Sequence, residues 1–95
     1  MSNQEQKKQQ VQIISDNEIS RGHYSNNMIV SHTQEEFILD WLLNSPNGSF
    51  QVARIIISPG HVKRLINALT DNFKRYEQSH GPVKMIDIKD QKFHD

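Results

Sequence analysis

The sequence predicts an α+β fold in which an antiparallel sheet of about three strands, or at most four, precedes one long amphipathic helix. Three observations lead to this prediction. Short segments rich in β-branched residues recur, an Asn-Gly turn lies at 47–48, and a proline at position 59 opens a long stretch with helical spacing. With 95 residues, 35% of them hydrophobic, the chain has enough material for one core.

A single domain is expected over residues 11–90, between two tails. Residues 1–10 carry no aliphatic side chain beyond Met1, so they cannot offset the entropy of ordering and are predicted to be a disordered polar tail. Residues 91–95 are assigned to a C-terminal tail. The start lacks the apolar run of a secretory signal, no segment approaches the ~20 apolar residues of a membrane helix, and cysteine is absent. We therefore expect a cytoplasmic protein with no membrane contact.

Two segments are candidates for the first two strands. Residues 28–31 form a short β-branched run after a polar stretch. Residues 35–43 are ambiguous, because Thr33 and Glu36 have the spacing of a helix capping box, whereas every second position from 37 to 43 is apolar, as in a strand. The Asn-Gly turn that follows favours the strand, since it is well placed to make a hairpin with the next β-branched run.

The third strand and the helix follow each other directly. Residues 51–57 are rich in β-branched side chains and end at Ser58, a suitable N-cap, with Pro59 at the first helical position. Gly81 is expected to end the helix after about 22 residues, or about 33 Å. The apolar stripe consists of Val62, Leu65, Ile66, Leu69, Phe73 and Tyr76. Two further segments are marginal candidates for edge strands, namely 11–15 and 83–88.

Apolar side chains are expected on both faces of the sheet. In the third strand, Val52 and Ile56 alternate with Ala53, Ile55 and Ile57. One helix covers only one face of a sheet, and an uncovered apolar face usually marks an interface. We therefore predict a homodimer or higher homo-oligomer. The alternative is that the terminal segments fold over the second face.

Interaction candidates follow from this interpretation. Tyr24 and Trp41 are the large amphipathic side chains that dominate interface hot spots, and core packing is the competing explanation for Trp41. Ile55 and Ile57 are the aliphatic candidates on the sheet.

Four basic residues on the helix suggest a different partner. The pairs Lys63–Arg64 and Lys74–Arg75 are eleven residues apart, about three helical turns, so they lie along one side. Such a side can follow a phosphate backbone, but eleven basic and eleven acidic residues give zero net charge, and Asp71 and Glu77 are placed to balance the pairs. We expect a solvated helix face and keep nucleic-acid binding as the alternative.

Catalytic and metal chemistry find little support in the sequence. His32 and His61 are two histidines that the fold could bring together, but their spacing matches no ligand motif. No glycine-rich phosphate loop and no triad arrangement is present, and Asp40 with Arg54 is expected to form a cross-strand ion pair rather than a catalytic one. The sequence predicts no enzyme, no cofactor and no metal site.

Several motifs in order resemble a known family. They are Tyr24-Ser25-Asn26, His32, Glu36 to Trp41, Arg54 to Leu65, Ala68-Leu69 and Asn72 to Glu77. Over about residues 22–83 the pattern is similar to an uncharacterised family of short bacterial proteins that carry a domain of unknown function. This sequence departs from it at Val62, where alanine is usual, and at His80-Gly81, where an aromatic residue usually precedes the glycine.

The resemblance implies a strand-strand-strand-helix domain without assigned activity or catalytic residues. A looser similarity of fold links it to the bacterial export chaperone SecB, which joins an antiparallel sheet to a long helix and forms oligomers. The expected function is therefore a noncatalytic, oligomeric protein-interaction module, of adaptor or chaperone-like type. The alternative is a nucleic-acid-binding protein that uses the basic side of the helix.

Overall fold

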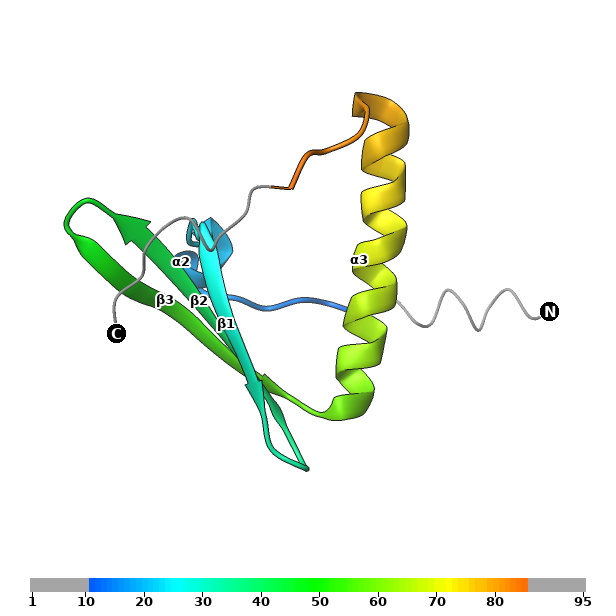
Figure 1. The fold of residues 1–95 in the computed structure, drawn as a ribbon. Coiled ribbons are helices and arrows are strands. Elements are labelled where there is room, and N and C mark those ends of the chain that lie inside the picture. The colour runs from blue at the N-terminus through cyan, green and yellow to red at the C-terminus, as the bar shows by residue number, and fades with distance from the viewer. Residues whose placement is uncertain (1–10, 86–95) are drawn as a thin grey trace. The chain divides into compact units, whose positions relative to one another are not determined.

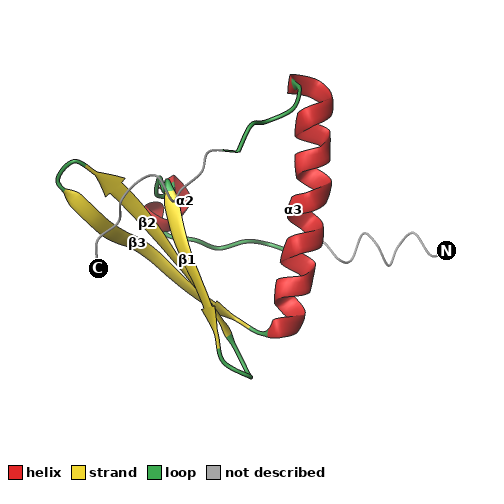
Figure 2. Cartoon of the chain, in the orientation of Figure 1, coloured by secondary structure: helices red, strands yellow, loops and turns green. Residues whose placement is uncertain are grey.

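The structure, a computed structural model, describes residues 11–85 (Figure 1). Three strands form one antiparallel sheet in the order β1-β2-β3, and a long helix follows them (Figure 2). The elements are α2 (Asn17–Arg21), β1 (Asn27–His32), β2 (Phe37–Ser45), β3 (Gly48–Ile57) and α3 (Pro59–His80). The predicted α+β class is confirmed, as is the strand interpretation of the ambiguous second segment.

The described residues belong to two compact units. One contains α2, β1 up to Ser31, and residues 38–55; the other contains the β1–β2 turn with its flanking residues, from His32 to Phe37, and the chain from Ile56 onward. The predicted tails, 1–10 and 91–95, lie outside the described residues.

The β1–β2 turn explains why its sequence was ambiguous. The Thr33 N–H donates to the Glu36 carbonyl at 2.9 Å, and the Thr33 hydroxyl accepts from the N–H groups of Glu35 and Glu36, both at 3.2 Å. The same threonine that resembles the first residue of a capping box therefore closes a turn between two strands.

The β2–β3 hairpin turns through Pro46 and Asn47. The Ser45 hydroxyl accepts from the Asn47 N–H at 3.2 Å, and Gly48 enters β3 at φ 130°, a conformation that side-chain-bearing residues rarely adopt. Proline and asparagine thus occupy the turn itself, and the glycine that formed half of the predicted Asn-Gly signal is the first residue of the strand.

Both predicted ends of α3 are confirmed. The Ser58 hydroxyl accepts from the His61 N–H at 3.2 Å, Pro59 opens the helix, and 22 residues later the Gly81 N–H donates to the Glu77 carbonyl at 2.8 Å. Gly81 has φ 90°, which suits a residue without a side chain.

Two local features differ from the predictions. Residues 11–15 are irregular and exposed rather than an edge strand, and residues 83–85 also lack strand structure, while the rest of that predicted strand lies outside the described residues. The short helix α2 was not predicted. Asp16 caps it by accepting from the Ile19 N–H at 2.9 Å, a local bond within a segment too short for a helical period to show.

Replacing Ser58 with alanine tests the helix start. Ser58→Ala removes the acceptor for the His61 N–H, so the free energy of unfolding should fall by about 1 kcal/mol in urea titrations followed by circular dichroism. Ser79→Ala, in the exposed last turn of α3, is the control and should stay within about 0.5 kcal/mol of the wild type. Equal losses in the two variants would contradict the capping role.

Candidate interaction surfaces

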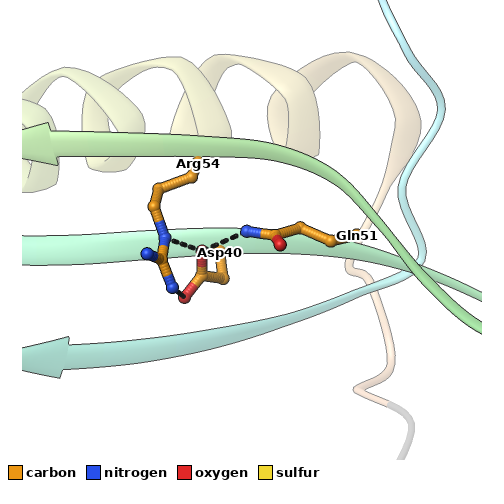
Figure 3. A network of polar contacts seen from close by, with 3 residues as sticks. All are labelled: Asp40, Gln51 and Arg54. Atoms are coloured by element: carbon orange, nitrogen blue, oxygen red, sulfur yellow. Dashed lines mark hydrogen bonds and ion pairs between the residues drawn. The ribbon is translucent and has the colours of Figure 1, made fainter.

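Asp40 of β2 is the centre of a polar network on one face of the sheet (Figure 3). Arg54 of β3 donates to Oδ1 from Nε at 2.7 Å and to Oδ2 from Nη2 at 3.1 Å, and Gln51 donates to Oδ1 at 2.7 Å. These are charge-assisted bonds in bidentate geometry. The hydrogen bonds from Arg54 lower the pKa of Asp40, against an opposing effect of burial. The predicted cross-strand ion pair is confirmed.

The network also shows how the faces of β3 are arranged. In a regular strand, residues three apart point to opposite faces, yet Gln51 and Arg54 both bond to Asp40. We infer one extra residue between them, a β-bulge, which agrees with ten residues in β3 against nine in β2. Val52 and Ile56, which strict alternation placed on one face, therefore lie on opposite faces.

The opposite face of the sheet is apolar. His32 stacks on Phe37 with ring centroids 5.1 Å apart, which places both on this face, away from the Asp40 network. Alternation from these anchors adds residues from all three strands. They are Met28, Val30, Leu39, Trp41, Leu43, Phe50, Val52, Ile55 and Ile57. We call this set, with His32 and Phe37, the apolar sheet face.

Three of the four predicted interaction residues share this surface. Trp41 is half-buried in β2, Ile55 is 49% exposed, and Ile57 is half-buried at the end of β3. Tyr24 precedes β1 and is 77% exposed, so it lies outside the three strands that form this surface. The polar contacts of β2 and β3 gather on the face of Asp40, which also carries the aliphatic residues Ile38 and Leu42.

Burial is low throughout the described part of the chain. Among residues 11–85, no side chain, apolar or polar, is buried. All nine residues of β2, the central strand, have intermediate exposure, while many large apolar residues of the other elements remain about half exposed. The sheet and α3 each therefore carry exposed apolar surface.

Helix α3 presents an apolar stripe that continues past its end. Ile66 and Leu69 are 55% and 60% exposed, and Phe73 stacks on Tyr76 with centroids 6.0 Å apart. After Gly81 the chain returns to the helix. The Val83 N–H donates to Oε2 of Glu77 at 3.1 Å, and Val83 lines an open groove of about 420 Å³ with Leu69, Asn72, Phe73 and Tyr76.

The groove was missed at the sequence level, because it depends on a contact between a side chain and a backbone group six residues apart. The apolar residue after Gly81-Pro82 was the available signal, since such residues often pack on the last turns of a helix.

The four predicted basic residues, Lys63, Arg64, Lys74 and Arg75, are all exposed on α3. Within residues 11–85 the only ion pair is that of Arg54 with Asp40, so none of the four is neutralised by a described acidic partner. Glu77, expected to balance Lys74, instead accepts from the Val83 N–H. Arg64 contacts Nδ1 of His61 at 3.1 Å.

The two histidines considered as metal ligands have other contacts. His32 stacks on Phe37, and Nδ1 of His61 lies 3.1 Å from Arg64. Among residues 11–85, no group of three or more His, Asp or Glu side chains is placed to hold a metal ion. No helix in this part of the chain has the length and apolar character needed to cross a membrane.

Comparison with known families gives one match. The family model described as "Protein of unknown function (DUF3467)" matches residues 1–85, so the chain belongs to this family. No curated protein and no solved structure matches the chain.

The lowered pKa of Asp40 predicts how the stability of the fold changes as the pH falls. A carboxylate with a lowered pKa in the folded state stabilises the fold above its unfolded pKa, about 3.9, and loses that contribution as the pH falls further. Asp40→Asn should therefore lower the urea midpoint at about pH 6, and the gap to the wild type should narrow by about pH 3. The exposed Asp71→Asn serves as control, with a small gap at both pH values. A gap for Asp40→Asn that is the same at both pH values would be evidence against the ion pair.

Proposed function

We propose that this chain, as a member of the DUF3467 family, is a noncatalytic, homo-oligomeric protein-interaction module of adaptor or chaperone-like type that works in the bacterial cytoplasm. The observation that carries this proposal is the absence of any buried side chain among residues 11–85. A fold in which even the central strand has no buried residue needs further apolar contacts to reach the usual 5–15 kcal/mol of stability. A second polypeptide is the direct source of such contacts.

The size of the missing contribution supports an obligate partner. Complete burial of a large aliphatic or aromatic side chain contributes about 1.5–3 kcal/mol. The apolar sheet face alone includes four side chains that remain about half exposed: Met28, Val30, Phe50 and Ile55. Covering them would contribute several kcal/mol by this measure, a large fraction of the stability of a small domain.

The chemistry of the sheet indicates which side the partner covers. Asp40, Gln51 and Arg54 satisfy one another's hydrogen bonds on their face, so covering that face would remove a hydrogen-bonded charged group from water. The apolar sheet face has no such groups apart from His32, and it contains Trp41, a residue type enriched at the centre of interfaces. We therefore place the self-interface on the apolar sheet face.

The solution mass of the full chain tests this proposal. Size exclusion with light scattering at micromolar concentration should give a multiple of the 11.1 kDa chain. Ile55→Asp should weaken association about tenfold or more, because it places a charge where an aliphatic side chain becomes buried. Ser49→Asp, on the exposed polar face of the same strand, should leave the mass unchanged.

The measured mass and the stability of Ile55→Asp together distinguish an oligomer from a monomer. Ile55 is already 49% exposed in the single chain, so a monomer should tolerate an aspartate there with little loss of stability. A wild type that elutes as an 11.1 kDa monomer would refute the homo-oligomer.

Nucleic-acid binding is the second candidate function, and one observation favours it. Lys63, Arg64, Lys74 and Arg75 are exposed and have no ion-pair partner among residues 11–85. The two pairs lie about 16 Å apart along one side of α3, within reach of several phosphates. Asp71 lies between them on the same side and reduces the local positive potential, which is why this function ranks second.

Heparin chromatography distinguishes the two candidates. Nucleic-acid binding predicts elution well above about 0.3 M salt and a shift to lower salt in a Lys74→Glu, Arg75→Glu variant. Lys84→Glu, which changes a cation beyond the end of α3, is the matched control. Elution of the wild type below that salt concentration would exclude the basic side of α3 as a site for phosphate backbones.

A further inference from the structure

We propose that α3 of one copy covers the apolar sheet face of a second copy, so that two chains exchange their helices in a swapped dimer. This inference rests on the homo-oligomeric function proposed above and specifies its interface. The occupant of the apolar sheet face is then the stripe that includes Ile66, Leu69 and Phe73 of the second copy.

The link between strand and helix is the first argument. β3 ends at Ile57 and α3 begins at Pro59, so Ser58 is the only residue between them. Strand-to-helix connections that let a helix fold back on its own sheet usually contain two to six residues. Ser58 is extended, with φ −75° and ψ 158°, and the proline ring restricts the next φ angle. A short, stiff link of this kind favours exchange between chains over closure within one chain.

The two surfaces match in length and character. A strand of nine or ten residues extends about 30 Å, and a helix of 22 residues extends about 33 Å. Both surfaces are apolar along their length, and each includes large side chains that are about half exposed, such as Val30 and Ile55 on the sheet and Ile66 and Leu69 on the helix. A helix that lies along the strands would therefore cover the whole apolar sheet face.

The buried area also suits a mutual exchange. Three strands about 4.8 Å apart and about 30 Å long present roughly 420 Å², and a helix stripe about 10 Å wide presents roughly 330 Å². Either surface alone is smaller than the roughly 800 Å² per partner of a stable interface, whereas the two together approach it. A swapped dimer uses both surfaces of each chain.

Charge does not oppose this pairing. The chain has eleven basic and eleven acidic residues and zero formal net charge, so two copies do not repel each other through their overall fields. The basic residues of α3 lie mostly off its apolar stripe and can remain in water when the stripe is covered.

Cysteine crosslinking between two distinguishable chains tests the exchange. The chain contains no cysteine, so Val30→Cys on the apolar sheet face and Ile66→Cys on α3 are unique reactive sites. An affinity-tagged Val30→Cys chain and an untagged Ile66→Cys chain are unfolded together, refolded as a mixture, and treated with a short bismaleimide. The expected product is a covalent tagged–untagged pair at twice the 11.1 kDa chain mass.

Other products have equally definite meanings. A Val30–Val30 product would show two sheets facing each other and would overturn the exchange. A dimer in which the Val30→Cys, Ile66→Cys double variant links only within one chain would overturn the exchange but keep the homo-oligomer. A monomeric wild type would refute the proposed function itself.

Lengthening the link provides an independent test. Gly-Ser-Gly-Ser inserted between Ile57 and Ser58 should let α3 fold back on its own sheet, so the mass should fall twofold, with helix content by circular dichroism unchanged. The same insertion after Gly81 is the control and should leave the dimer intact. An insertion variant that remains a dimer would contradict the role assigned to the one-residue link.

Discussion

The balance between apolar surface and burial is the constraint on which this structure depends. Residues 11–85 form a three-stranded sheet and a 22-residue helix, yet they bury no side chain. Chain entropy opposes every ordered residue, and apolar burial is the main term that offsets it. The elements are well formed locally, through turns, caps and cross-strand pairs, but the energy that keeps a domain folded has to come from additional apolar contacts. This is the physical basis on which a partner is proposed.

The Asp40 network gives the sheet its two different sides. Because Arg54 and Gln51 both bond to one carboxylate, β3 has to present them on the same face, and an extra residue in the strand makes this possible. The following residues, Ile55 and Ile57, are then directed to the face of Trp41. The aromatic side chains of the sheet, Phe37, Trp41 and Phe50, lie on the opposite surface, which is why the proposed interface is placed there.

Helix α3 combines two sides with different chemistry. Its apolar stripe extends through Phe73 and Tyr76 to the groove at Val83, while its basic pairs remain exposed. Zero net charge and the position of Asp71 weaken an electrostatic role, so the apolar side is the better indicator of function. The family to which the chain belongs has no assigned function, so the proposed function rests on the physical chemistry of these surfaces.

The sequence by itself determined the features whose signals are local: Ser58, Pro59 and Gly81 bound α3, and β-branched runs with a turn between them mark strands. It also identified the pair of Asp40 with Arg54, because partners in adjacent strands follow from a hairpin. Tertiary structure alone decided that Thr33 closes a turn instead of capping a helix, that Gln51 and Arg54 bond to the same carboxylate, and that Val83 returns to α3. Each of these depends on which hydrogen-bonding group comes within reach in three dimensions, and periodicity along a chain contains no information about that.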